Sequence, residues 1–146
     1  YKMKKKILIV AANFYVDFCN KLINSAKEEL KNFKNVDLIK VPGIFEIPVT
    51  ISRKIKKYDG VIALGCVIKG ETPHFDFISK STTDAIMFLG VTHKKPIGNG
   101  IITCLNQSQA SARTTKGGEA AKAVISVLSQ KWRNQFSAQK TIQELL

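Results

Sequence analysis

The sequence lacks the features that would assign it to a membrane, secreted or zinc-binding class. Its 146 residues contain no apolar run long enough to cross a bilayer, and no signal-peptide pattern opens them. It has only three cysteines, at the widely spaced positions 19, 66 and 104, and no CxxC or Cys/His ligand pattern accompanies them. We therefore expect a cytoplasmic protein with small buried cysteines, no structural metal and no disulfide framework.

Arginine is scarce relative to lysine. Arg53, Arg113 and Arg133 are the arginines among 23 basic residues, which outnumber 11 acidic ones and give a formal net charge of +12. A charge of this size can indicate nucleic-acid binding. The lysines are scattered along the chain, however, and the two short clusters at 4–6 and 54–57 are not interleaved with aromatic residues. This favours a solvated basic surface that attracts anionic substrates, and we expect no nucleic-acid and no membrane partner.

The chain also lacks internal repeats and low-complexity linkers, which favours a single domain. A length of 146 residues with 45% hydrophobic residues fits one globular core. We assign residues 1–146 to one domain, with residues 1–5 as a basic leader and residues 134–146 as a polar tail that is expected to fray.

Hydrophobic periodicity predicts alternating strands and helices. Buried strands are predicted at residues 7–10, 36–41, 61–68 and 96–103, the last interrupted by Gly98-Asn99-Gly100. Helices are predicted at residues 19–33, 47–55, 73–89 and 106–113, and, after a break at Lys116-Gly117-Gly118, over Ala121, Val124, Leu128 and Trp132. This order predicts an α/β three-layer sandwich of flavodoxin-like type, with a central parallel sheet of about four strands and helices on both faces.

Most candidate functional residues directly follow predicted strands. Phe14 follows the first strand, residues 44–46 follow the second, and residues 70–74 follow the third. Because parallel strands end at one edge of the sheet, and ligands of such folds bind there, these residues are expected to converge on a site.

His74 is the strongest catalytic candidate. Thr72 and Pro73 are typical of a helix N-cap and first helical position, which places His74 in the first turn of the helix. An imidazole there can exchange protons near neutral pH. A lone histidine is more often structural, and the Thr-Pro-His context is what favours a catalytic role.

Gly70, Glu71 and Thr72 form a candidate phosphate cradle, because backbone N–H groups at a helix start bind anions. An ordinary helix cap explains the same residues equally well. Arg113 would add a charge-assisted contact to the same phosphate, although an isolated arginine is more often a surface residue.

Two motifs, in this order, resemble one enzyme family. Residues 41–48 (VPGIFEIP) and 65–76 (GCVIKGETPHFD) are similar to segments of 6,7-dimethyl-8-ribityllumazine synthases, and the similarity runs from about residue 7 to residue 132. These transferases catalyse the penultimate step of riboflavin synthesis. They condense 5-amino-6-(D-ribitylamino)uracil with 3,4-dihydroxy-2-butanone 4-phosphate and release phosphate and water. The resemblance implies that neither a metal nor an organic cofactor is needed.

The resemblance also implies roles for individual residues. His74 becomes the proton-transfer residue, and the phosphate ligands become Gly70, Glu71, Thr72 and Arg113. The pyrimidine and ribityl site is implied to consist of Phe14, Ile44, Phe45, Glu46, Cys66, Val67, Ile68 and Asn99. Asn99 stands where the family often has Phe in a wall from the neighbouring subunit. Lys116 is a less specific match, because the connection from Arg113 is shorter than in the family.

The partners implied by the resemblance are small-molecule substrates, riboflavin synthase and further copies of the chain. The copies would form a pentamer-based homo-oligomer with shared active sites. The short connection between Arg113 and Lys116 favours an isolated pentamer or its dimer over a capsid. The alternative function is a non-catalytic flavin- or lumazine-binding protein on the same scaffold, which the presence of His74 and Arg113 disfavours.

Overall fold

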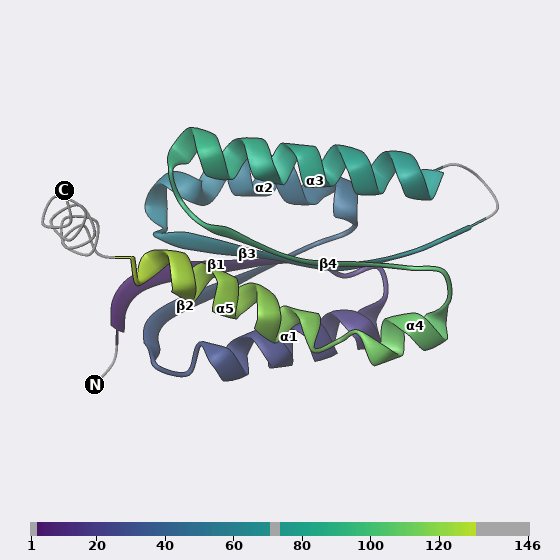
Figure 1. The fold of residues 1–146 in the computed structure, drawn as a ribbon, viewed down its shortest axis with the longest axis horizontal. Coiled ribbons are helices and arrows are strands. Elements are labelled where there is room, and N and C mark those ends of the chain that lie inside the picture. Colours follow the sequence, from purple (N-terminus) through teal and green to yellow (C-terminus); the bar gives the residue numbers. More distant parts are fainter. Residues whose placement is uncertain (1–2, 71–73, 131–146) are drawn as a thin grey trace, which may run out of the picture.

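A four-stranded parallel sheet forms the centre of the fold. The computed structural model describes residues 3–70 and 74–130. Its strands are β1 (Met3–Ala12), β2 (Phe33–Val41), β3 (Gly60–Ile68) and β4 (Ile97–Cys104). They are all parallel and lie in the order β2-β1-β3-β4 (Figure 1).

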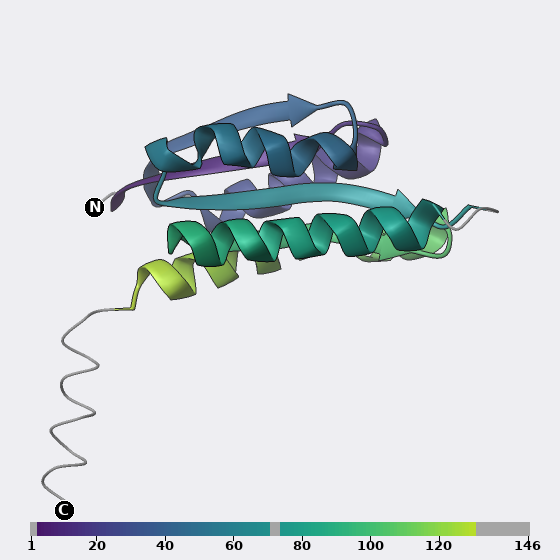
Figure 2. The ribbon, with the colours of Figure 1, turned by 90° about the horizontal axis from the view of Figure 1, so that it is seen from above.

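Helices cover both faces of this sheet. One face carries α1 (Val16–Glu29), α4 (Gln107–Ala112) and α5 (Lys116–Leu128). The other carries the short 3₁₀ helices η1 (Ile44–Glu46) and η2 (Ile55–Lys57), with α2 (Ile47–Lys54) and α3 (His74–His93). Figure 2 shows the strands running in one direction beneath α2 and α3. The predicted three-layer α/β fold is therefore confirmed.

Alternate strand residues build a separate core on each face. In β1, Ile7 and Ile9 pack with α1 and α5, whereas Leu8 and Val10 pack on the side of α2 and α3. All four side chains are completely buried. Burial on both faces is what a near-continuous apolar run in a parallel sheet predicts. Within the described part of the chain, no helix is both long and apolar enough to span a membrane.

Several element boundaries differ from the prediction. β1 begins at Met3, so residues 3–5 of the expected leader belong to the strand, and β2 begins at Phe33, which was expected to extend the first helix. Met3 and Phe33 are paired across the two strands, so ladder pairing carries both strands beyond their apolar centres. α3 continues past residue 89 to His93, and the chain leaves the helix at Lys94, which has a positive φ of 53°.

The two predicted glycine breaks are wrong. β4 runs through Gly98, and α5 begins at Lys116 and contains Gly117. A Cβ atom at Gly98 would overlap the carbonyl oxygen of Ala120, and one at Gly117 would overlap that of Leu22. The glycines therefore allow α5 to approach β4 and α1 closely.

The start of α5 is held by a side chain from α1. Ser25 Oγ accepts a hydrogen bond from the Gly118 N–H at 2.9 Å and donates one to the Thr115 carbonyl at 3.3 Å. This satisfies a backbone donor that a helix start leaves without an intrahelical partner. The remainder of the predicted last helix at Trp132 and the tail at 134–146 lie outside the described residues.

Candidate active site

A cavity of about 270 Å³ lies at the carboxyl edge of the sheet. Its walls come from the loop after β1, the turn into η1, the end of β3 and the start of α3. The lining residues are Phe14, Tyr15, Gly43, Ile44, Phe45, Cys66, Val67, Ile68, His74 and Ile78. Three parts of the chain that are far apart in the sequence, around residues 14, 44 and 66–78, meet here because their parallel strands end at the same side of the sheet.

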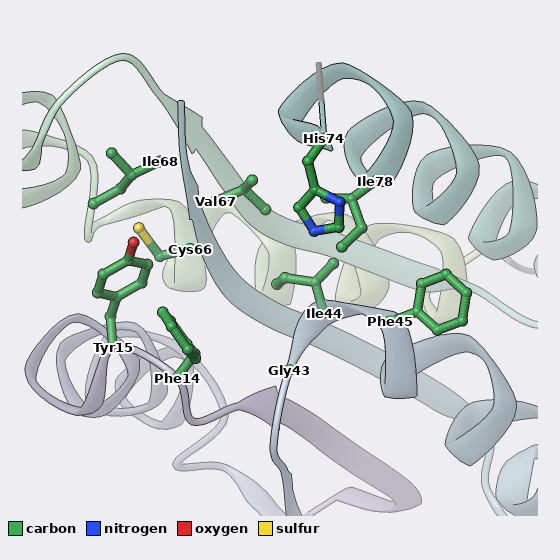
Figure 3. A pocket seen from close by; sticks show the side chains of 10 residues that line it. All are labelled: Phe14, Tyr15, Gly43, Ile44, Phe45, Cys66, Val67, Ile68, His74 and Ile78. Carbon is green, nitrogen blue, oxygen red and sulfur yellow. The ribbon is translucent and has the colours of Figure 1, made fainter. Parts of the chain in front are cut away.

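His74 stands at one side of this cavity. It is the first residue of α3, and its side chain is exposed. Figure 3 shows the imidazole extending from the helix start toward Ile44, beside Ile78. An imidazole in this place can be reached by solvent and by a ligand, so it can exchange protons with a bound molecule.

Two phenylalanine rings lie at the cavity rim. Phe14 is 73% exposed and Phe45 is 71% exposed, which is unusual for side chains of this size. Phe14 packs edge-on against Tyr15, with ring centroids 4.9 Å apart. The Phe45 ring points away from Phe14 in Figure 3. Rings this exposed offer apolar faces on which a flat heterocycle can stack.

The turn after β2 packs closely on β3. Ile44 is buried and crosses β3 at Gly65, where a Cβ atom would overlap the Ile44 side chain. Glu46 is half-buried and does not line the cavity. Its Oε1 atom would lie 3.2 Å from a Cβ at Gly43, so the carboxylate folds back toward a residue that does line it.

Cys66 contributes a thiol to the cavity wall, and this thiol is a poor nucleophile. Burial raises its pKa to about 12, and the neighbouring Cys104 thiol adds to the rise. At pH 8 a pKa of about 12 leaves a thiolate fraction of only ~10⁻⁴. Covalent catalysis by Cys66 is therefore disfavoured.

We expect Cys66→Ala to lower kcat by less than about tenfold, well below the effect of losing a proton-transfer residue. Alanine removes the thiol and keeps the backbone groups of β3 at this position. Steady-state rates of the variant, together with the rate of iodoacetamide labelling at pH 8, check this expectation. Rapid alkylation of Cys66 with parallel loss of activity would contradict it.

Arg113 and Lys116 lie together in a second hollow of about 380 Å³ beside the edge strand β4. The Arg113 side chain is anchored there, because its Nη1 atom donates a hydrogen bond to the Thr103 carbonyl at 2.8 Å. Glu119 also lines the hollow, and the two cationic groups outnumber its carboxylate, which favours an anion. Neither residue lines the His74 cavity.

Asn99 lines a third hollow, of about 220 Å³, between α3 and β4. Its Oδ1 atom accepts a hydrogen bond from the Ile101 N–H at 3.0 Å, so the side chain satisfies a donor of its own strand. One protomer thus brings His74 together with Phe14, Phe45 and the end of β3. It does not bring Asn99, Arg113 and Lys116 to the same cavity.

Only Gly70 of the expected phosphate cradle lies within the described residues. Gly70 is exposed and does not line the cavity, whereas Glu71 and Thr72 lie outside the described residues. Tyr15, Gly43 and Ile78 do line the cavity, although they are not among the sequence-predicted site residues. Tyr15 and Gly43 adjoin predicted site residues, and Ile78 lies one helical turn after His74. This spacing along the sequence could have predicted all three as cavity residues.

The sequence as a whole matches one family model. The model describes 6,7-dimethyl-8-ribityllumazine synthase and matches residues 4–131. The chain belongs to this family. The resemblance predicted from two motifs is therefore confirmed over most of the chain.

Individual lumazine synthases from bacteria are similar to the chain over nearly their full length. A protein named 6,7-dimethyl-8-ribityllumazine synthase 1 from Rhodopseudomonas palustris is 43% identical over 141 residues, covering 88% of this chain and 86% of its own. The synthase from Agrobacterium fabrum is 42% identical over 141 residues, with 88% and 95% covered. The synthase from Aliarcobacter butzleri is 37% identical over 138 residues, with 87% and 88% covered. The alternative of a non-catalytic binding protein gains no support from these lumazine synthases.

Proposed function

We propose that the protein condenses 5-amino-6-(D-ribitylamino)uracil with 3,4-dihydroxy-2-butanone 4-phosphate to form 6,7-dimethyl-8-ribityllumazine. The observation that carries the proposal is an exposed imidazole at the wall of a cavity whose rim bears two exposed aromatic rings. Membership in the lumazine synthase family supplies the reaction. Both substrates are small molecules, and none of the steps requires a metal or an organic cofactor.

The reaction consists of additions and eliminations that need protons moved at each stage. The amine of the pyrimidine attacks the ketone, and loss of water gives an imine. Elimination then expels the phosphate, the ribitylamino nitrogen closes the ring, and water leaves. His74 is proposed to carry protons between these groups, because its side chain lines the cavity in which the two substrates are proposed to react.

Holding the two reactants together is expected to contribute most of the acceleration. A well-oriented pair reacts with an effective molarity that lowers the barrier by roughly 7–11 kcal/mol. Phe14 and Phe45 are proposed to hold the pyrimidine ring, with Ile44, Val67 and Ile68 beside it. Glu46 is proposed to bind ribityl hydroxyl groups, since it folds back toward the cavity wall at Gly43.

We also propose that the site is shared between copies of the chain. The Arg113 hollow opens beside β4, an edge strand, whereas the His74 cavity lies at the ends of β1 and β3. A head-to-tail contact would set strand β4 of one copy against the His74 cavity of the next, and such contacts form a ring when the rotation between copies closes. Arg113, Lys116 and Asn99 would then complete the neighbour's site. Gly70, Glu71 and Thr72 are proposed to bind the same phosphate.

Exposed apolar residues support an assembly of this kind. α3 alone exposes Phe77, Met87, Phe88 and Val91, each by 66–70%. Met87, Phe88 and Val91 lie within four positions of one another on this helix, and exposed apolar residues grouped in this way mark interaction sites. A pentamer is the assembly that the family resemblance favours, and sedimentation of the purified protein tests it. The same resemblance supports riboflavin synthase as a proposed partner.

The decisive experiment supplies both substrates and follows the fluorescence of the lumazine product. We expect continuous product formation with stoichiometric release of phosphate. Tight binding of lumazine without any product formation would instead favour a non-catalytic binding protein.

Arg113→Ala is expected to raise KM for the phosphorylated ketone by about tenfold, while KM for the pyrimidine changes little. A hydrogen bond to a charged group contributes about 1.5–3 kcal/mol, and the neighbouring Lys116 is expected to compensate in part. Initial rates with each substrate varied in turn measure both constants. Equal changes in the two KM values would place the phosphate elsewhere.

A further inference from the structure

Lysines gather at the edge of the sheet opposite to the His74 cavity. All parallel strands begin at one edge, on the left in Figure 1, and a lysine-bearing segment lies at the start of each strand. The ten lysines are Lys4, Lys5, Lys6, Lys31, Lys34, Lys54, Lys56, Lys57, Lys94 and Lys95, which we call the lysine edge. These ten lysines are scattered along the sequence, but the fold gathers them because segments far apart in sequence meet at the strand starts.

Hydrogen bonds hold these segments against one another. The Lys6 N–H donates to Asp59 Oδ2 at 2.7 Å, and the Asp59 N–H donates back to the Lys6 carbonyl at 2.8 Å. Lys95 Nζ donates to the carbonyl oxygens of Ile55 and Lys56 at 3.0 and 3.3 Å. The starts of β1, β3 and β4 are thus tied together, and the lysine edge is a fixed surface of the fold.

Acidic side chains do little to neutralise this surface. Eight of the ten lysines are exposed, and Lys54 and Lys95 are half-buried. Among the described residues, Lys31 alone of the ten pairs with a carboxylate, that of Glu28 at 3.2 Å. Asp59 accepts a backbone N–H and Asp37 accepts the Tyr58 hydroxyl at 2.6 Å, and both keep their negative charge. Ten lysines outnumber the carboxylates of Glu28, Asp37 and Asp59, so the lysine edge keeps a net positive charge.

Attraction of the proposed substrates does not account for this charge. The strands contain eight to ten residues, so a rise of about 3.3 Å per residue separates the two edges of the sheet by roughly 25–30 Å. At physiological ionic strength the Debye length is only ~8 Å. Screening thus isolates the lysine edge from the His74 cavity.

We propose that the lysine edge binds the phosphodiester backbone of nucleic acid without reading its sequence. Four strands about 4.8 Å apart spread the lysines over roughly 15 Å. A duplex carries one negative charge per ~1.7 Å of its axis with both strands counted, so a duplex segment of this length carries about nine phosphate charges. The geometry matches a linear polyanion better than a single phosphate.

The lysine edge is richer in lysine than in the side chains that read bases. Base recognition typically uses arginine, amide or exposed aromatic side chains, and of these Arg53, Asn32 and Asn35 are exposed beside the ten lysines. Tyr58, the aromatic residue beside η2, is half-buried and hydrogen-bonded. Membrane binding draws on apolar anchors as well as charge. Phe33 and Ile55, which adjoin Lys34 and Lys56 in the sequence, are buried.

The test measures binding of the full-length protein to fluorescein-labelled 20-base-pair DNA and 20-nucleotide RNA of mixed sequence, by anisotropy between about 50 and 200 mM salt. We expect similar affinities for unrelated sequences and a steep loss of affinity with salt. Lys56→Glu/Lys57→Glu should weaken binding at least tenfold. It should also reduce the slope of log affinity against log salt by about 2, since each duplex phosphate contact contributes ~0.9.

The matched control is Lys21→Glu/Lys40→Glu, which makes the same change in net charge on exposed residues away from the lysine edge. It should weaken binding less than about threefold. Both double variants should retain lumazine formation, which reports that they fold. Lys56→Gln/Lys57→Gln is the second edge variant in case charge reversal disturbs η2.

Three results would overturn the proposal. The first is no binding at the lowest salt concentration. The second is an equal loss in the edge and control variants, which would attribute binding to overall charge. The third is binding to phosphatidylserine vesicles that depends on Lys56 and Lys57 while both nucleic acids fail to bind, which would assign the surface to membranes.

Discussion

Replacement of His74 by alanine is expected to lower kcat by about 10²–10⁴-fold, the usual contribution of a positioned proton-transfer group. The substrates should still bind, because the aromatic rim and the end of β3 remain. The residual rate should exceed that of the uncatalysed reaction, since reactant positioning persists. The fold should be unaffected, because the His74 side chain is exposed at a helix start. Steady-state lumazine fluorescence measures kcat, and a thermal unfolding curve measures the stability of the fold.

His93→Ala is the matched control for this variant. His93 ends the same helix, and so it lies at the opposite edge of the sheet from the cavity. Its loss should leave kcat within about twofold of the parent enzyme, well below the effect of a proton-transfer group. An unchanged kcat in His74→Ala would remove this imidazole from the mechanism. Equal losses in both variants would point to damage of α3.

Gly117→Ala is expected to lower the free energy of unfolding by about 3 kcal/mol, the upper end of the range for overpacking. Alanine is the better helix former by about 1 kcal/mol, so helix propensity alone predicts the opposite sign. The added methyl would overlap the carbonyl oxygen of Leu22, a main-chain atom that cannot rotate away. α5 would have to move off α1. Urea unfolding of the purified variant measures the change.

Gly70→Ala serves as the stability control, because a Cβ atom at Gly70 would have no neighbour within 4 Å. Its free energy of unfolding should stay within about 0.5 kcal/mol of the parent value. Gly117→Ala with unchanged or increased stability would mean that α1 and α5 can separate without cost. The tight contact at Leu22 would then contribute nothing to the fold.

The local pattern of the sequence was sufficient to predict most of the fold. The apolar run after Asp59 predicted a strand buried on both faces, and β3 is buried from Gly60 to Val67. The Asn106 side chain caps α4 through the Gln109 N–H at 2.9 Å, as expected for a helix that begins there. Such features depend on residues a few positions apart, so the amino-acid sequence alone determines them.

Boundaries and glycines were harder to predict because they depend on distant partners. Phe33 extends β2 because it pairs with Met3, thirty positions earlier. Gly98 and Gly117 are typical of breaks when only their neighbours are considered, yet each lies inside an element where α5 approaches another backbone. Sequence periodicity contains no information about such contacts.

The sequence by itself determined the family, the parallel α/β scaffold and the residue types available for chemistry, with His74 first among them. The order of the predicted strands also placed Phe14, Phe45 and His74 together at the strand ends. Only the tertiary structure decided that Arg113 and Lys116 lie in a separate hollow beside β4, and that ten other lysines gather where the strands begin. The physical reason is that a parallel sheet sorts the chain by strand direction, bringing every strand start to one edge and every strand end to the other.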